Sequence, residues 1–385
     1  MLTEQEIKSM RRDAAKKLRA GDLTGSIEVQ ERLVEQIMAG GAQSVRAQPA
    51  LAAQLESASS ELVDSLRWLR QFDKAIALQD RLVEYLPDTA PVLQVGSANL
   101  RIESGQIEEG LAQLEALAAA GEDNFWFQLS LGLGYLYAER LDPAGEVLRR
   151  AAGLAHARKV DRALAQQYLF KLYDIQGKPE EALAAWREAC RLDSKLRAGM
   201  LPAVIRMLIY WHKFSLASDH IFMESHPVRS EFYRGLLFNA LVQRKMAEAS
   251  WKWVADENDP SGLQEGQDEY AEACVRLNMP DKAIQALQPL VDAGQTGYFR
   301  VVILGLAYAQ RRDYTRALWF TESALRLGDM ERPRRTMPAP QGRILDIHAR
   351  LLYAQSPVDH DIRLRLERYF SPVKKQDEEE KKQPE

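Results

Sequence analysis

The residue types that most often hold metal ions gather in one short stretch, HIFMESH, which contains His220, Glu224 and His226. His220 and Glu224 are four residues apart and would share one face of a helix, as two zinc ligands do. His226 precedes Pro227, however, and falls in a turn away from that face. We therefore expect solvated residues at a helix end and no metal site.

Two other patterns that could bind or react are equally weak. The run Gly132, Leu133, Gly134 has two of the glycines that cradle a phosphate, but no strand is predicted before it and no third glycine follows in register. Cys190 and Cys274 have no Cys or His nearby at metal-ligand spacing, which predicts packing residues in a reducing compartment rather than a disulfide. Motifs such as Gly-x-Ser-x-Gly and His-Glu-x-x-His are absent from the sequence. We therefore expect no catalytic residues, no metal and no cofactor.

Composition and charge exclude several classes of protein. The chain has 385 residues, with 51 Lys and Arg against 55 Asp and Glu, so its net charge of −4 lacks the basic excess of a general nucleic-acid binder. The first residues, MLTEQEIKSMRRDAAKKLRAGD, are charged throughout, which predicts neither a signal peptide nor an anchor. No apolar run approaches the length needed to cross a bilayer. We expect a cytoplasmic protein without membrane insertion.

A small residue that begins an apolar helical run recurs along the chain. It occurs at Ser26, Ala75, Gly110, Ala144, Ala182, Ala217, Ala249, Ala283 and Ala317. Successive gaps are 49, 35, 34, 38, 35, 32, 34 and 34 residues, so all but the first lie close to 34. Such a period is typical of a helical repeat array, and it suits a chain longer than one compact core usually supports. No strand-like alternation bounded by turns appears, so the fold should be all-helical.

This period, with one helix-turn-helix in each unit, resembles the tetratricopeptide repeat (TPR). The unit that starts at Phe125 matches best, with Leu131 and Gly132 at consensus positions 7 and 8, Tyr135 at position 11 and Ala144 at position 20. Small residues at positions 8, 20 and 27 let the two helices of a unit approach closely, and large residues beside them fill the remaining space. The resemblance covers about residues 7 to 330.

We predict an all-α fold, a right-handed superhelical solenoid of about nine TPR-like helix-turn-helix repeats with a C-terminal helical cap. The 49-residue gap implies an insertion, which either extends the neighbouring helices or forms a loop. A solenoid needs its last apolar face covered, and the last fifteen residues contain almost nothing that could be buried. The predicted segments are 1–40, first repeat; 41–55, insertion; 56–330, repeats two to nine; 331–340, loop; 341–370, capping helices; and 371–385, disordered tail.

In the TPR family, the first helices line a concave groove that binds a peptide, a helix or a partner domain through positions 2, 5, 9, 12 and 13. Here those positions give an apolar-aromatic centre beside a basic stretch, followed by the acidic residues Glu265, Asp268 and Glu272. An aromatic anchor beside Arg and Lys suits a short segment with an apolar residue and a carboxylate. The predicted partner-binding residues are Trp126, Leu129, Leu133, Tyr137, Lys171, Arg206, Tyr210, Arg234 and Phe238.

The resemblance therefore implies a protein-interaction scaffold or adaptor, not an enzyme, with a protein or peptide partner. Two alternatives stay open. One is a regulatory or assembly subunit of an enzyme complex, and the other is an RNA-binding helical repeat, which the mixed-sign groove and the net charge disfavour. The family's dicarboxylate clamp, which binds chaperone C-termini, requires Lys at position 5 and Asn at position 9 of one unit. The sequence does not match it, because Asn99 is at position 9 but Val95 occupies position 5. An exposed solenoid end could also support a homo-oligomer.

Overall fold

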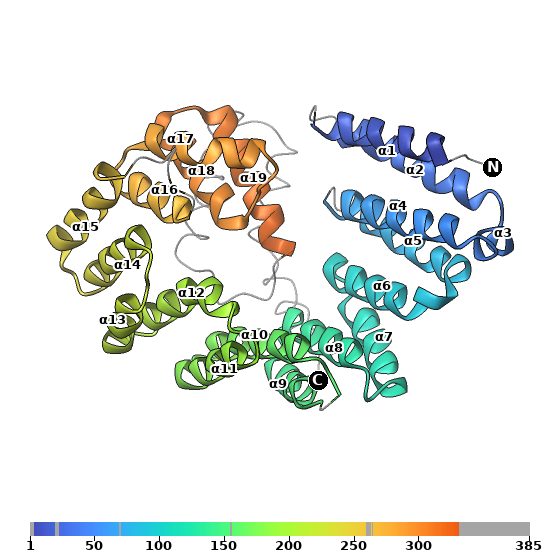
Figure 1. The fold of residues 1–385 in the computed structure, drawn as a ribbon, viewed down its shortest axis with the longest axis horizontal. Coiled ribbons are helices and arrows are strands. Elements are labelled where there is room, and N and C mark those ends of the chain that lie inside the picture. The colour runs from blue at the N-terminus through green and yellow to red at the C-terminus, as the bar shows by residue number, and fades with distance from the viewer. Residues whose placement is uncertain are drawn as a thin grey trace, which may run out of the picture. The chain divides into compact units, whose positions relative to one another are not determined.

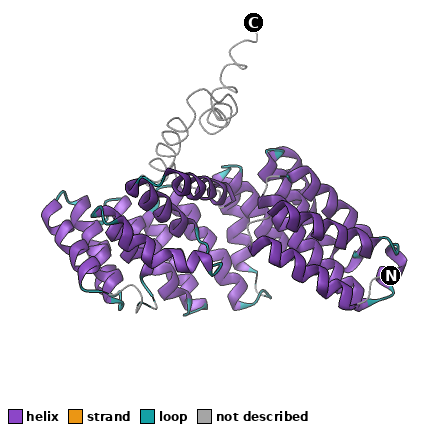
Figure 2. Ribbon diagram, turned by 90° about the horizontal axis from the view of Figure 1, so that it is seen from above, coloured by secondary structure: helices purple, strands orange, loops and turns teal. Residues whose placement is uncertain are grey.

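The regular secondary structure of the described chain is entirely helical (Figure 2). The computed structural model describes residues 4–19, 23–68, 71–154, 156–258, 263 and 265–330. No strand occurs among these residues. The prediction of an all-α fold is therefore confirmed.

Nineteen α-helices follow one another in the described residues. They are α1 (Glu4–Arg19), α2 (Leu23–Met38), α3 (Ala42–Arg46), α4 (Pro49–Trp68), α5 (Phe72–Tyr85), α6 (Ala90–Ser104), α7 (Ile107–Ala120), α8 (Phe125–Tyr137), α9 (Leu141–Gly153), α10 (Lys159–Ile175), α11 (Pro179–Leu192), α12 (Leu196–Tyr210), α13 (Phe214–Phe222), α14 (Pro227–Ala240), α15 (Arg244–Asp256), α16 (Gln267–Arg276), α17 (Pro280–Asp292), α18 (Tyr298–Arg311) and α19 (Tyr314–Met330). Apart from the short α3, they form nine successive helix-turn-helix units, from α1–α2 to α18–α19. This number agrees with the repeats predicted from the sequence.

These repeats belong to two compact units, Met1–Arg197 and Ala198–Glu385. Within the first unit, α6, α8 and α10 lie on the inner side of the stack and α7, α9 and α11 on the outer side (Figure 1). Within the second unit, α12, α14 and α16 lie on the inner side, and α13 and α15 on the outer side (Figure 1). In each unit, therefore, the first helices of successive repeats share one face.

Small residues lie where the two helices of a repeat come closest. Ala75, at position 20 of the second repeat, has no exposed surface. A Cβ atom added to Gly132, at position 8, would lie 2.7 Å from Cδ2 of Leu148, and one added to Gly305 would lie 3.0 Å from Cγ2 of Thr321. A larger residue at either position would require the facing side chain to shift. The small consensus residues are thus explained by helix contact within each repeat.

The tyrosine at position 11 connects neighbouring repeats. The Tyr135 hydroxyl donates to Oε1 of Glu115 at 2.7 Å, and the Tyr308 hydroxyl donates to Oε1 of Gln288 at 2.8 Å. In both cases the acceptor lies 20 residues earlier, on the second helix of the preceding repeat. Burial and the bond to Glu115 raise the pKa of Tyr135 to about 12, so its hydroxyl stays a donor at neutral pH. The side chain therefore fixes the spacing between repeats.

The turns between the two helices of a repeat share one backbone conformation. From the third repeat onward, the residue two positions before the second helix has a positive φ. These residues are Gly105, Glu139, Gly177, His212, Val242, Asn278 and Arg312. Glycine adopts this conformation without strain, whereas a β-branched residue such as valine rarely does. The turn is thus set by the packing of the helices as well as by local sequence.

The seventh repeat differs in register from its prediction. The sequence placed position 20 at Ala249, but Ala249 is exposed and Ala247 is only 1% exposed. Ala247 lies three residues into its helix, which begins at Arg244, as Ala75 does in the second repeat. The assignment of Ala249 is therefore wrong by two residues. Every groove position predicted for α14 from that anchor moves by the same amount.

The insertion is largely helical. It supplies α3 and the first part of α4. Val45 of α3 has no exposed surface and packs into the apolar core of the first two repeats. Arg46 donates through Nε to the carbonyl oxygen of Glu84 at 3.0 Å. The insertion thus both extends a neighbouring helix and forms a short element that packs against α5.

Three predicted segments near the C-terminus lie outside the described residues. They are the loop at 331–340, the capping helices at 341–370 and the tail at 371–385. The described chain ends with α19, the second helix of the ninth repeat.

Candidate functional site

The predicted partner-binding residues lie on the inner helices of both units. In the first unit they are Trp126, Leu129, Leu133 and Tyr137 on α8 and Lys171 on α10; in the second they are Arg206 and Tyr210 on α12 and Arg234 and Phe238 on α14. The side chains of the two sets have different surroundings.

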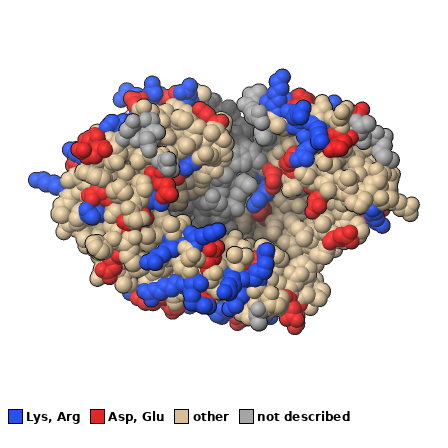
Figure 3. Space-filling model, viewed as in Figure 1, with Lys and Arg blue, Asp and Glu red and all other residues tan. Residues whose placement is uncertain are grey.

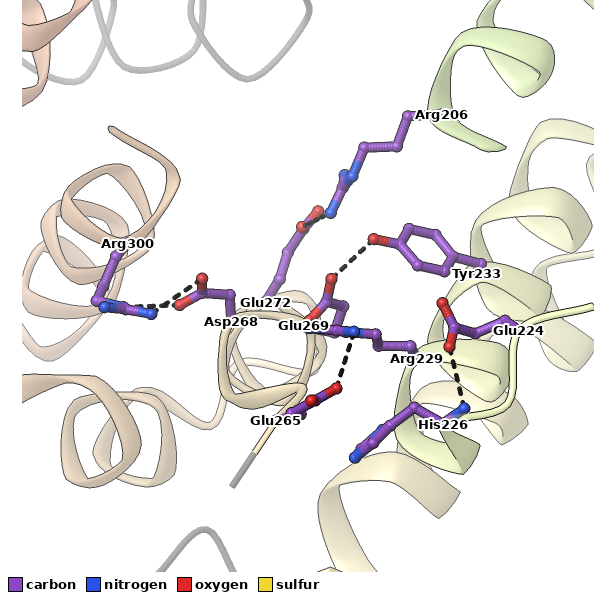
Figure 4. Close-up of polar contacts among 10 residues, drawn as sticks. All are labelled: Arg206, Glu224, His226, Arg229, Tyr233, Glu265, Asp268, Glu269, Glu272 and Arg300. Atoms are coloured by element: carbon purple, nitrogen blue, oxygen red, sulfur yellow. Dashed lines mark hydrogen bonds and ion pairs between the residues drawn. The ribbon is translucent and has the colours of Figure 1, made fainter. Parts of the chain in front are cut away.

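Arg206, on α12, belongs to a polar network on the inner helices of the second unit (Figure 4). Its Nη2 donates to Oε2 of Glu272, on α16, at 2.8 Å. Three aromatic rings surround the guanidinium, with centroids 5.3 to 5.4 Å away: Phe232, Tyr233 and Phe299. Only 26% of the Arg206 side chain and 13% of the Glu272 side chain are exposed. This ion pair is therefore largely shielded from water. Its electrostatic attraction is stronger there than it would be in water, because the surroundings have a lower dielectric constant.

Further polar contacts join the neighbouring inner helices to α16. Nε of Arg229, on α14, lies 3.7 Å from Oε2 of Glu269. The hydroxyl of Tyr233 donates to Oε1 of the same carboxylate at 2.7 Å. On the other side, Nε of Arg300, on α18, donates to Oδ1 of Asp268 at 2.9 Å. The carboxylates of α16 thus hold three first helices together (Figure 4).

The pKa shifts of Glu272 and Tyr233 keep the first group charged and the second neutral at pH 7. Burial alone would raise the pKa of Glu272, but the guanidinium groups of Arg206 and Arg276 lower it to about 2. Burial also raises the pKa of Tyr233, and the neighbouring Glu269 adds to this effect. Neither group can exchange a proton readily near pH 7, as a general acid or base must. Glu272 and Tyr233 are therefore suited to holding helices together rather than to transferring a proton.

Glu272 should make the stability of the second unit depend on pH. Its pKa in the folded chain is below its ordinary value of 4.5, so its contribution is complete above pH 4.5 and is lost as the pH falls toward 2. Replacing Glu272 with Gln removes this titration. In urea unfolding followed by circular dichroism, we expect the stability difference between the wild type and the variant to shrink by about 2–3 kcal/mol between pH 7 and pH 2. A difference that stays constant over this range would contradict the assigned role of the carboxylate.

The acidic stretch predicted for the eighth repeat pairs with this chain's own arginines. Asp268 and Glu272 are paired as described above, and Oε2 of Glu265 lies 3.2 Å from Nη1 of Arg229. The Glu265 side chain stays 64% exposed, whereas that of Glu272 is only 13% exposed. Their combined charge is therefore largely compensated within the second unit.

Sequence reasoning missed four members of this cluster: Arg229, Tyr233, Glu269 and Arg300. The register error in the seventh repeat explains one of them. With Ala247 at position 20, Arg229 on α14 falls at consensus position 2 of the seventh repeat, which is one of the groove positions. Arg234 and Phe238 were chosen from the register of Ala249, and in the structure Arg234 pairs with Glu231 on its own helix while 48% of its side chain is exposed. The use of Arg234 and Phe238 in partner binding stays a prediction.

The first unit presents apolar side chains on its inner helices. Trp126 is 51% exposed, and Val92, at the same position of the preceding repeat, is 70% exposed. The Trp126 ring lies edge-on to Phe125, with centroids 5.3 Å apart. The Asn124 side chain accepts hydrogen bonds from the first turn of α8 and so fixes the place where this helix begins. These contacts orient Trp126 without covering it.

The other predicted residues of the first unit are less accessible. Leu129 is 3% exposed, so its side chain packs inside the repeat rather than facing the surface. Leu133, Tyr137 and Lys171 are half-buried. The exposed part of this surface is therefore centred on Trp126.

The stretch HIFMESH does not bring its ligand types together. His220 is 4% exposed, and its Nδ1 lies 2.7 Å from the carbonyl oxygen of Leu216, so the expectation that it is solvated was wrong. The carboxylate of Glu224 accepts a hydrogen bond from the backbone N–H of His226 at 3.0 Å. Within the described ranges, no group of three or more His, Cys, Asp and Glu could hold a metal ion. No helix in the same ranges is long and apolar enough to cross a membrane.

Comparisons with known proteins find similarity in structure but not in sequence. No family model matches the chain, and no curated protein matches its sequence. A tetratricopeptide repeat protein from Parabacteroides merdae is 10% identical with a TM-score of 0.35, covering 90% of this chain and 98% of that one. The C-terminal part of a TPR repeat-containing protein from Cytophaga hutchinsonii is 14% identical with a TM-score of 0.35, covering 66% of this chain and 98% of that one.

A third solved structure, Naa15/Naa10 bound to HypK-THB, is 15% identical with a TM-score of 0.37, covering 94% of this chain and 65% of that one. The helix pairs of this chain, the close contacts at positions 8 and 20 and the Tyr135 and Tyr308 bonds between repeats are those expected from the resemblance seen in its sequence. The described chain is an all-α array of nine helix-turn-helix repeats.

Proposed function

We propose that this chain is a protein-interaction scaffold that holds a segment of a partner protein on the inner surface of its first unit. The observation that carries the proposal is the exposure of Val92 and Trp126, 70% and 51%, at equivalent positions of neighbouring inner helices. Apolar side chains that remain exposed together on one face of a folded chain are typical of a docking surface.

The side chains around Trp126 suggest the chemistry of the partner segment. Leu133 and Tyr137 follow Trp126 along α8, and Lys171 lies on the next inner helix. An aliphatic or aromatic side chain of the partner would pack against Trp126, and a carboxylate would be attracted to Lys171. A short segment that combines these two features fits the surface best.

The second unit has a different part in this proposal. Arg206 already donates to a largely buried carboxylate and is enclosed by three aromatic rings. Using it for a partner would break an ion pair that is costly to separate. We therefore assign Arg206 to the stability of the second unit, and the proposed contact set is centred on α6 and α8.

Replacing Val92 with Asp and Trp126 with Ala should remove partner binding. The double change removes the exposed Trp126 side chain and places a carboxylate at position 92. We expect it to weaken binding at least about tenfold. The measurement is quantitative affinity purification of the tagged chain from its native cells, followed by titration of each purified protein that the wild type retains.

Trp253 provides a matched control. It is 41% exposed and lies on α15, a second helix of the other unit. Trp253→Ala should retain the same partners as the wild type. If both variants lose the same proteins, or if neither loses any, the inner surface of the first unit is not the binding surface.

A further inference from the structure

Charge is unevenly distributed along the first unit. Residues 149–197 contain 11 Lys and Arg against 6 Asp and Glu, whereas residues 1–148 contain 14 against 23. The basic residues gather over α9 to α11, at the lower edge of the space-filling view (Figure 3). A net-negative chain thus carries a strongly basic region over α9 to α11, which its total charge of −4 conceals.

This region is formed where α9 and α11 end and α10 begins. Nε of Arg162, on α10, donates to the carbonyl oxygen of Ala152, near the end of α9, at 3.0 Å. The pKa of Glu188, near the end of α11, is lowered mainly by Arg191 and further by the charge of Arg162, so Glu188 also lies close to Arg162. The three helix ends are therefore neighbours. We call this surface the basic edge, and its members are Arg150, Arg158, Lys159, Arg162, Arg187, Arg191, Lys195 and Arg197.

The acidic side chains at the basic edge compensate only part of its charge. Arg158 forms two 2.8 Å hydrogen bonds with Asp161, and Arg191 forms two 2.6 Å hydrogen bonds with Glu188. Both arginine side chains stay about 70% exposed, at 72% and 68%, and pairs with such exposure contribute little to stability. The remaining members give the edge a net positive charge.

Helix stability explains only some of these charges. Cations at the ends of α9 and α11 complement the negative ends of the helix dipoles. Arg158 and Lys159, however, lie at the start of α10, where the dipole disfavours a cation and favours an anion. No side chain caps this helix start. Asp161, in the same first turn, already pairs with Arg158, so the charge at this helix start that an incoming anion would complement is that of Lys159.

An exposed aliphatic side chain lies within the basic edge. Val160, in the first turn of α10, is 51% exposed and follows Lys159 directly. No Phe, Tyr or Trp, on which a nucleic-acid base could stack, occurs in residues 149–162 or 187–197, and Nε2 of the exposed His156 ring lies 2.7 Å from the carbonyl oxygen of Asp123. A long polyanion would also be repelled by the acidic residues of the adjoining repeats. The edge therefore fits a short acidic protein segment better than RNA.

We propose that the basic edge is a second docking surface, which binds an acidic segment of a partner protein with an aliphatic residue against Val160. This surface lies on the helix ends of α9 to α11, so it goes beyond the inner surface around Trp126. Complementary charge attracts the segment, and the contact of its aliphatic residue with Val160 fixes where the segment lies along the basic edge.

The test uses the full chain and a fluorescent peptide of about twelve residues that repeats Glu-Glu-Leu-Glu, with binding followed by anisotropy at low salt. We expect binding to weaken about tenfold when Lys159 and Lys195 are both replaced by Glu. Val160→Ser should weaken binding a few-fold while leaving its salt dependence unchanged, because that contact carries no charge. A peptide with Gln in place of Glu should not bind.

A charge-matched control replaces Arg244 and Lys245 with Glu, because both are exposed on α15 of the other unit. This variant should bind the acidic peptide as the wild type does. An equal loss in both variants, or tighter binding of a uridine oligonucleotide than of the peptide, would overturn the proposal. The Val92→Asp, Trp126→Ala variant should still bind the peptide, and its failure to do so would show that the two surfaces are one.

Discussion

Replacing Arg206 with Ala should destabilise the second unit by about 3 kcal/mol. The change removes the charge that compensates Glu272, whose side chain is only 13% exposed, and it leaves a space among three aromatic rings. Removing one partner of a shielded ion pair is costly because the other charge remains, and the lost ring contacts add to the effect. Urea unfolding measures the total loss. Hydrogen exchange should show it as faster exchange of amides in α12, α14 and α16.

Arg234 supplies the control for this prediction. It was predicted from the sequence to share the role of Arg206, but its side chain is 48% exposed and its partner, Glu231, is on the same helix. Arg234→Ala should therefore cost less than about 1 kcal/mol. If the two variants have equal stability, the cluster around Glu272 does not hold the inner helices together. Partner binding by an Arg206 variant must be compared at equal folded fraction, because its instability alone would reduce binding.

The repeat architecture could be predicted from the sequence because its determinants are local and recur. Ala144 and Gly132 are small for the same steric reason in each repeat, so their spacing reveals the two helices without knowledge of the other repeats. Tyr135 and Tyr308 recur because each bonds the preceding repeat. A fold made of neighbouring contacts leaves a periodic record in the sequence.

The register of the seventh repeat could not be predicted because its turn lacks the usual signal. Gly105 and Gly177 mark the left-handed turn residue in two repeats, but Val242 occupies this place before α15 with a φ of 63°. Valine disfavours that conformation, so nothing in the local sequence predicts it. Two alanines, Ala247 and Ala249, then compete for position 20, and only burial distinguishes them.

The candidate site was predicted less well than the fold because exposure depends on contacts between distant residues. The sequence placed Leu129 and Trp126 on the same inner surface, but Leu129 is buried in the structure and half of Trp126 is exposed. Arg206 and Glu272 are separated by 66 residues, so their ion pair has no local signature. The consensus position of a residue predicts where it lies on its helix. Whether its side chain is free to bind a partner protein depends on contacts within the folded chain, such as that of Arg206 with Glu272.

Replacing Gly110 with Val should destabilise the first unit by about 3 kcal/mol. Gly110 is at position 20 of the third repeat, where α7 crosses α6. A Cβ atom there would lie 2.6 Å from the backbone oxygen of Ala98 and 2.6 Å from Cγ1 of Ile102. A backbone oxygen cannot move aside as a flexible side chain can, so the two helices must separate. Thermal or urea unfolding measures the loss, and hydrogen exchange should locate it in α6 and α7.

Gly199→Val is the matched control because it makes the same replacement inside a helix without a steric conflict. Gly199 is exposed on α12, and a Cβ atom there would have no neighbour within 4 Å. Valine is a slightly better helix former than glycine, so this variant should be neutral or more stable by a few tenths of a kcal/mol. Gly110 gains the same helix propensity, and any loss measured there is therefore due to the contact between α6 and α7. If both variants are equally stable, close helix approach at position 20 is not what requires the small residue.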